Sequence, residues 1–175
     1  MENEEQLTKI EAARRQLRTA IELFFEDRDD VAVCSLAIAA HGILRGLVPQ
    51  RGSMLHKYAA SVGAEFKEDF DKYEAFYRQS DIDPGESVQH QPMFTIFWLL
   101  DCILMHWNLT TKMPPHHVAF QIWLAHMHPQ LARREFVEYV ERPQSSGRQA
   151  AKSVFLDGLR KGKFAIEIRP EPKEG

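Results

Sequence analysis

Cysteine, long uninterrupted apolar runs and an excess of charge of one sign are all scarce in this chain. Its two cysteines, Cys34 and Cys102, both fall within apolar helical patterns. A thiol in such a pattern usually behaves as a small buried hydrophobe, so we expect both to be reduced and structural. The sequence therefore gives no support to a disulfide-stabilised scaffold.

The charge balance is close to neutral, because 22 Lys and Arg face 25 Asp and Glu and leave a net charge of -3. An overall positive field that would hold nucleic acid or an anionic membrane is thus missing. The most apolar stretch, 92–108, is interrupted by Asp101 and His106 and is too short and too polar for a bilayer crossing. Residues 1–6 lack the basic-then-apolar layout of a secretory signal. We expect a cytoplasmic protein without membrane contact.

Motifs for several common chemistries are also missing. The sequence contains no glycine-rich phosphate loop and no serine in a glycine-flanked elbow. Its eight histidines include no His-Glu-x-x-His or Glu-x-x-His pattern, which a helical zinc or iron site would favour. We therefore expect no metal and no cofactor. The late histidines are expected on the surface or at helix ends; they are His106, His116, His117, His126 and His128.

Apolar residues recur at intervals of three and four along most of the chain, which indicates helices that pack by one face. The expected helices cover residues 7–25, 31–48, a short stretch after 53, 66–80, 92–108, 115–128, 130–140 and 150–159. Leaving aside the short stretch after 53, they predict an all-α bundle of about six or seven helices, with helices 31–48 and 92–108 buried at its centre. We expect 1–142 to form the bundle domain, 143–168 to pack on it as a C-terminal helix and extension, and 169–175 to be frayed.

The second expected helix has three features of interest. Asp29 and Asp30 are placed to accept backbone N–H groups at its start. Gly42 and Gly46, one turn apart, leave a groove that a neighbouring helix can approach closely. His41 lies among apolar residues, and we favour a core histidine with a hydrogen-bond acceptor over a catalytic one.

Two clusters are candidate binding sites. Tyr73, Phe76 and Tyr77 are interpreted as an aromatic surface, followed by Asp81 and Asp83 in a proline turn that ends the helix or binds a ligand. A basic strip late in the chain is suited to phosphate contacts, although we favour a solvated helix face, because aromatic residues for base stacking are scarce beside it. The strip contains Arg148, Lys152, Arg160 and Lys161.

Arg51 and His56 form a possible catalytic pair. Some helical ribonucleases use this spacing, in which arginine stabilises phosphate charge and histidine transfers a proton. Gly52 and Ser53 place a turn between the two residues, however, and the spacing is common by chance.

Three segments carry a resemblance to known proteins. They are residues 12–25 with the acidic turn and alanine-rich helix that follow, residues 76–84 reading Phe-Tyr-Arg-Gln-Ser-Asp-Ile-Asp-Pro, and Pro114-Pro115 leading to His128-Pro129. Together they are similar to a bacterial family of small, uncharacterised helical proteins within or near the HEPN superfamily. Members of this superfamily are helical bundles and are often dimers.

The resemblance also bears on catalysis. Catalytic HEPN ribonucleases carry Arg-x4-6-His late in a helix, where paired copies at a dimer interface cut RNA without metal. In this chain Glu74, Ala75 and Gln79 stand at the corresponding positions, and glutamine cannot transfer a proton near neutral pH. The resemblance therefore implies a non-catalytic binding or scaffold module, as a homodimer or with a protein partner.

Two alternatives remain open at the level of the sequence. The first is a metal-independent HEPN-type ribonuclease, acting as a toxin or defence component, that uses Arg51 and His56 or Arg78 with a histidine from elsewhere. The second is an RNA-binding regulatory protein that acts through the basic strip.

Overall fold

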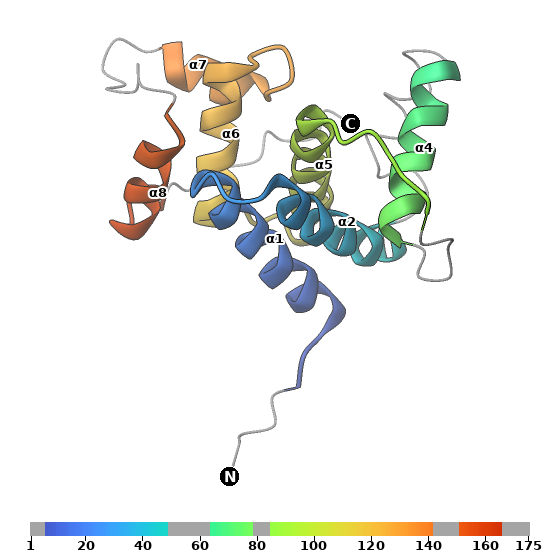
Figure 1. Ribbon diagram of the computed structural model, residues 1–175. Coiled ribbons are helices and arrows are strands. Elements are labelled where there is room, and N and C mark those ends of the chain that lie inside the picture. Colours follow the sequence, from blue (N-terminus) through green and yellow to red (C-terminus); the bar gives the residue numbers. More distant parts are fainter. Residues whose placement is uncertain (1–5, 49–63, 79–84, 142–150, 166–175) are drawn as a thin grey trace, which may run out of the picture.

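The computed structural model describes residues 6–48, 64–78, 85–141 and 151–165, and every regular element within these ranges is a helix. The helices are α1 (Lys9–Phe25), α2 (Asp30–Leu47), α4 (Ala64–Arg78), α5 (Pro92–Thr110), α6 (Pro115–Met127), α7 (Arg134–Glu141) and α8 (Lys152–Arg160). Figure 1 shows them gathered into a bundle. The predicted all-α bundle of six or seven helices is confirmed.

Side-chain caps define the starts of the first two helices. The Thr8 hydroxyl accepts a hydrogen bond from the Glu11 N–H at 3.2 Å, and the Asp29 carboxylate accepts one from the Val31 N–H at 2.9 Å. Each cap satisfies an N–H that has no partner within its helix. α1 and α2 pack against each other, and α2 packs on α5.

α5 is the central helix of the bundle. Pro92 stands at its first position, and buried side chains lie around most of its circumference. By length and composition alone α2 and α5 both resemble membrane spans, yet α5 is mostly buried within the bundle, where it packs against α2 and α1. The predicted burial of this helix is confirmed.

The prediction that α2 is buried around most of its circumference is wrong for one face. Its buried residues Cys34, Ile38, His41 and Leu44 face the interior, whereas an opposite stripe is exposed. The exposed stripe includes Val31, Ser35, Ala39, Gly42 and Gly46. Alanine and glycine count as apolar in a sequence pattern, but their small surfaces can face water at little cost.

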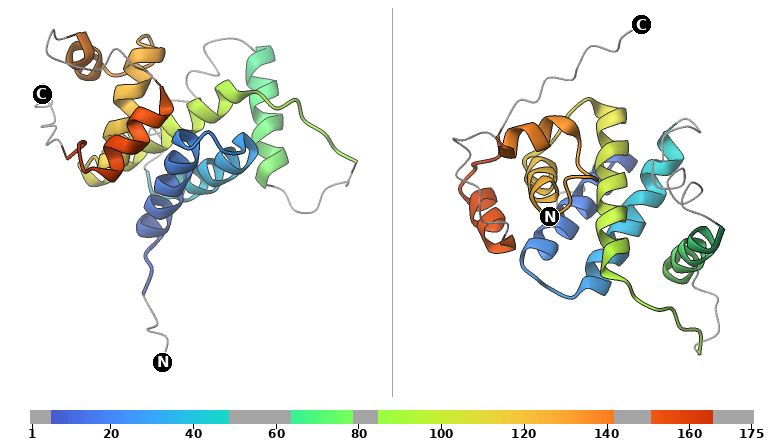
Figure 2. Two further views of the ribbon diagram at one scale, coloured as in Figure 1. Left: turned by 60° about the vertical axis from the view of Figure 1, so that its left-hand side comes forward. Right: turned by 90° about the horizontal axis from the view of Figure 1, so that it is seen from above.

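α4 lies at one end of the bundle and α8 at the other, as the views in Figures 1 and 2 agree. Phe70 and Tyr73 of α4 are buried, while Lys67, Glu68 and Asp69 are exposed. α8 packs on α1 and α6.

α7 begins later than the predicted residue 130. The segment before Arg134 forms turns instead, in which the Leu131 N–H donates to the His128 carbonyl at 2.9 Å.

Candidate functional site

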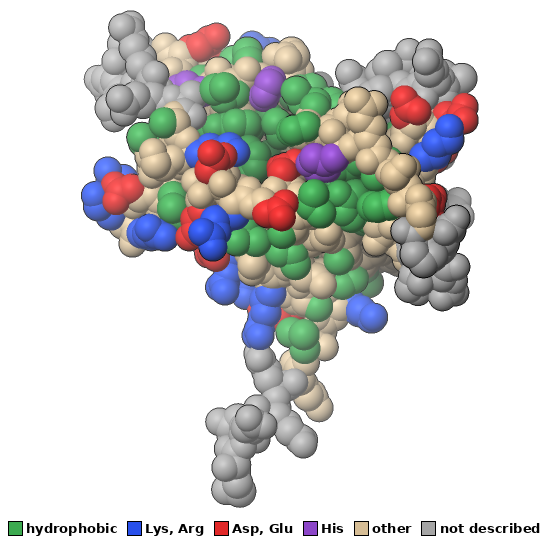
Figure 3. All heavy atoms as spheres, in the orientation of Figure 1, with side chains coloured by type: hydrophobic (Ala, Val, Ile, Leu, Met, Phe, Trp, Pro, Cys, Tyr) green, Lys and Arg blue, Asp and Glu red, His purple; other side chains and the backbone are tan. Residues whose placement is uncertain are grey.

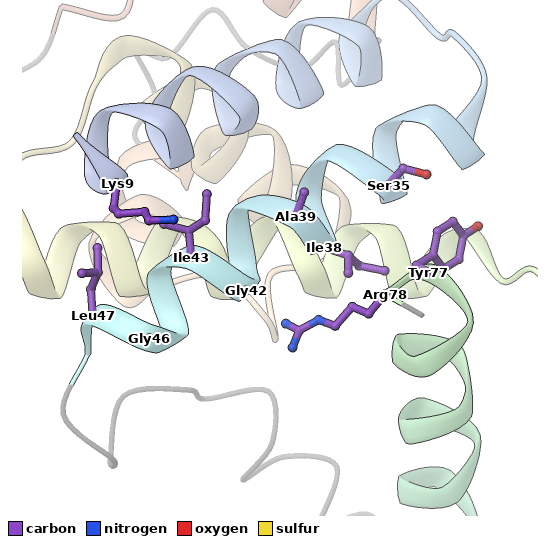
Figure 4. A pocket seen from close by; sticks show the side chains of 10 residues that line it. All are labelled: Lys9, Ser35, Ile38, Ala39, Gly42, Ile43, Gly46, Leu47, Tyr77 and Arg78. Carbon is purple, nitrogen blue, oxygen red and sulfur yellow. The ribbon is translucent and has the colours of Figure 1, made fainter. Parts of the chain in front are cut away.

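An open groove runs along the exposed stripe of α2. It holds about 640 Å³ and lies between the start of α1 and the end of α4 (Figure 4). Its floor is made mostly of small and aliphatic side chains, and its polar groups come from Lys9, Ser35, Tyr77 and Arg78. We call this hollow the α2 groove; it is lined by Lys9, Ser35, Ile38, Ala39, Gly42, Ile43, Gly46, Leu47, Tyr77 and Arg78.

Arg78 reaches across the groove from the last turn of α4. Its Nη1 lies 2.8 Å from Glu74 Oε1, and the same oxygen lies 3.3 Å from Arg45 Nη1 on α2. A Cβ added to Gly42 would meet Arg78 Nη2 at 3.4 Å. The groove predicted at Gly42 and Gly46 therefore exists, but an arginine side chain rather than a neighbouring helix approaches Gly42, and nothing lies within 4 Å of a Cβ at Gly46.

Behind Arg78 lies a buried histidine–aspartate pair. His41 Nε2 is 2.9 Å from Asp101 Oδ2 on α5, and His41 Nδ1 is 3.2 Å from Arg78 Nη2. A guanidinium can only donate, so Nδ1 must be the acceptor and Nε2 must carry the proton donated to Asp101. His41 is therefore a core histidine with a side-chain acceptor, as expected from the sequence.

This arrangement limits what the site can do chemically. His41 is fully buried, and both of its ring nitrogens have a partner. A general base must reach the proton that it removes, and here Arg78 stands between Nδ1 and the groove. The described groove is suited to binding, and proton transfer would require Arg78 to move first.

A second polar cluster joins α2, α4 and the segment before α5. His90 Nε2 donates to Asp30 Oδ2 at 2.7 Å, and the Tyr73 hydroxyl lies 2.6 Å from His90 Nδ1. Thr95 donates to the same Asp30 oxygen, and the Cys34 thiol lies 3.5 Å from the Tyr73 hydroxyl. These contacts connect three segments that are distant in the sequence.

The thiols of this protein are not activated as nucleophiles. Burial raises the pKa of Cys34 to about 11 and holds the pKa of Cys102 well above its ordinary value. Burial also raises the pKa of the Tyr73 hydroxyl. Both cysteines are free and buried, so the structural role predicted for them is confirmed.

A third cluster places three histidines near the start of α6. The rings of His106 and His117 meet edge to face at 4.9 Å, and His116 Nε2 lies 2.8 Å from Glu22 Oε1. Burial lowers the pKa of all three. In the described part of the chain, no group of three or more His, Cys, Asp or Glu is arranged to hold a metal ion.

The aromatic surface predicted on α4 needs a correction. Tyr73 is fully buried, because its ring packs on Phe94 at 5.0 Å and its hydroxyl meets His90. Phe76 and Tyr77 are half-buried. Tyr77 lines the α2 groove, whereas Tyr73 and Phe76 border a smaller hollow of about 220 Å³ on the other side of α4.

The described members of the basic strip are paired within the chain. Lys152 bonds Asp27 at 2.9 Å, Arg160 bonds Glu26 at 3.1 Å and Lys161 bonds Asp157 at 2.7 Å. On the face shown in Figure 3, basic and acidic side chains lie next to each other around α1 and α8. These pairs reduce the positive charge that the strip presents to a phosphate backbone.

Several predicted site residues lie outside the described residues. They are Arg51, His56, Asp81, Asp83 and Arg148. Of the predicted catalytic candidates only Arg78 is described, and the histidine it meets is His41.

Sequence reasoning missed Asp101, Asp30 and His90 as members of polar clusters. A signal existed for Asp101, since a carboxylate within a strongly apolar helix must find a partner when it is buried. No local signal indicated the contact of His90 with Asp30, because the two residues lie 60 positions apart.

Comparisons with known proteins identify no relative. A scan against protein-family models finds no match, and neither the curated proteins nor the solved structures contain a significantly similar one.

Proposed function

We propose that this protein is a non-catalytic helical binding module that accepts a helical segment of another protein in the α2 groove. The observation that carries the proposal is the exposed stripe of small residues on α2, which opens a groove of about 640 Å³ instead of packing against a described helix. Small residues let a second helix approach closely and contact the floor over a wide area.

The HEPN-like assignment is part of this proposal and rests on the sequence segments alone. It is compatible with a module that has lost catalysis, because Glu74 binds Arg45 and Arg78 instead of leaving room for a substrate phosphate.

The groove is better suited to a different protein than to a second copy of this chain. A two-fold interface brings the same patch of both copies together, so Lys9, Arg45 and Arg78 of two molecules would face one another. Like charges at close range disfavour such a contact. The homodimer expected from the resemblance is therefore proposed to use another face.

A display library of helical peptides, panned against the purified full chain, tests the proposal. We expect enrichment of peptides that bind the wild type and lose binding to Gly42→Leu, whose side chain fills the groove beside Arg78. Ala32→Leu, exposed on α2 outside the groove, is the matched control and should retain binding. Absence of enriched peptides, or equal binding to Gly42→Leu, would contradict the proposal.

Sedimentation of the same variants tests the dimer separately. We expect the wild type and Gly42→Leu to have the same oligomeric state. Dimerisation that is abolished by Gly42→Leu would show that a second copy occupies the groove.

The second candidate function is metal-independent RNA cleavage, favoured by the contact of Arg78 with His41 and of His41 with Asp101. In this mechanism a phosphate draws Arg78 away and opens His41 Nδ1 as a general base. Cleavage of RNA in chelator by the wild type, lost in His41→Gln and retained in Arg134→Gln on α7, would replace the binding module as the leading function.

A further inference from the structure

The charges around the α2 groove indicate the chemistry of its occupant. Lys9 and Arg78 line the groove, and Arg45 shares Glu74 with Arg78. Glu74 contacts both Arg45 and Arg78, and the buried Asp101 lies behind them, bonded to His41. Counted over the described residues, these three cationic groups and two carboxylates leave a local excess of one positive charge, in a chain whose net charge is -3.

Arg78 is held in place with donors to spare. A guanidinium has five N–H donors in a fixed fork. Within the described part of the chain, the bonds to Glu74 and His41 use one donor on Nη1 and one on Nη2. The side chain is 34% exposed, so the remaining donors can meet a ligand.

Lys9 supplies the second cationic group. Figure 4 shows Lys9 and Arg78 reaching from opposite ends of the groove toward the stretch of α2 around Gly42 and Ile43. Among the described residues Lys9 forms no ion pair, so an incoming carboxylate would displace no described partner from it.

We propose that the groove recognises an acidic helix of a partner protein, in which one Asp or Glu binds Arg78 and small apolar residues on the same face contact the floor of α2. This inference rests on the proposed binding function and names the chemistry of its ligand. A planar guanidinium fixed by two neighbours is well placed for bidentate contact with a carboxylate. Because it is already positioned, little side-chain entropy is lost on binding.

The floor favours a protein segment over a nucleic-acid backbone. Ile38, Ala39, Ile43 and Leu47 offer an apolar surface that phosphates and sugars would leave unused. Among the described residues that line the groove, Tyr77 is the one aromatic group, whereas nucleic-acid channels use successive aromatic side chains. One uncompensated positive charge also suits a single carboxylate better than a polyanion.

The peptide library gives a test that separates this inference from the proposed function. Among peptides that the wild type binds and Gly42→Leu does not, we expect Asp or Glu to be enriched at one position, with Ala, Gly or Leu three or four residues away. Against Arg78→Gln the acidic preference should vanish, and an acidic peptide should bind about tenfold to a hundredfold more weakly. Arg134→Gln on α7 makes the same chemical change away from the groove and should leave affinity unchanged.

The outcomes distinguish the two claims. If Gly42→Leu abolishes binding while Arg78→Gln keeps both affinity and acidic preference, the groove binds a partner but the carboxylate inference is wrong. If the enriched peptides are basic or purely apolar, the inference is equally wrong. If Gly42→Leu changes nothing, the proposed function itself fails. Thermal unfolding of each variant establishes that Arg78→Gln and Gly42→Leu remain folded.

Discussion

The buried carboxylate of Asp101 fixes the orientation of His41 at the interior end of the α2 groove. The two side chains are 2% and 0% exposed, so neither can replace a lost partner with water. We expect Asp101→Ala to reduce the free energy of unfolding by about 3 kcal/mol, because a buried imidazole N–H is left unsatisfied. Asp101→Asn retains an acceptor oxygen and should cost about 1 kcal/mol. Urea unfolding measures both, and equal losses would contradict the assigned tautomer.

Substitution of glycine by alanine should have opposite effects on stability at Gly46 and at Gly158. A Cβ at Gly158 would lie 2.6 Å from the Phe164 ring, which stacks on Phe155 at 5.9 Å, whereas a Cβ at Gly46 would meet nothing within 4 Å. We expect Gly46→Ala to stabilise the protein by about 0.5–1 kcal/mol through the lower backbone entropy of the unfolded chain. Gly158→Ala should destabilise it by about 1 kcal/mol, because the ring must shift. Urea unfolding that shows equal stabilisation would contradict this assignment.

At the scale of helices, His90 holds the segment before α5 against α2 and α4. His90 contacts Asp30 at the start of α2 and Tyr73 within α4. We expect His90→Ala to cost about 2 kcal/mol, because the buried Tyr73 hydroxyl and Asp30 both lose a partner. Hydrogen exchange should then increase in α4 more than in α6, since α4 loses a direct contact.

A double-mutant cycle isolates this contact. Tyr73→Phe and His90→Ala should show a coupling energy of about 1 kcal/mol. The exposed pair Glu68 and Lys72, four residues apart on α4, is the control and should couple by no more than about 0.5 kcal/mol. Equal coupling energies in both cycles would show that the contact of His90 with Tyr73 does not stabilise the segment.

The helices could be predicted because burial of one helix face requires apolar residues at intervals of three and four in the sequence. Pro92 and Pro115 mark the starts of α5 and α6, and Phe70 and Tyr73 mark the buried face of α4. The same pattern led us to overestimate the burial of α2, because alanine and glycine occur on both buried and exposed helix faces. The contact of Arg78 with His41 could not be predicted from the sequence, because it depends on how α2 and α4 cross and not on any local pattern.

At the scale of the whole molecule, the buried histidines predict loss of stability in mild acid. Burial lowers the pKa of His106 and His117, so both are held neutral in the folded state near neutral pH. In the unfolded chain a histidine has a pKa of about 6.5 and takes up a proton below that pH. The unfolded state then binds more protons than the folded state, so stability is complete above about pH 6.5 and is lost as pH falls from there toward the lowered pKa values.

Each histidine that stays neutral in the fold should contribute a slope that rises to about 1.4 kcal/mol per pH unit as pH falls below about 6.5. Replacing the buried ring by an apolar side chain in His117→Leu removes one such proton, so its stability should fall less steeply between about pH 6.5 and pH 5. Gln121→Leu, at a buried position on α6 that carries no titratable group, is the control and should keep the wild-type slope. The ion pairs of Glu11 with Arg14 and Arg15 do not interfere, because they hold its pKa at about 2 and weaken only as pH falls below about 4.5. Urea unfolding from pH 7.5 to 5 checks the prediction, and an unchanged slope in His117→Leu would show that His117 is not held neutral by the fold.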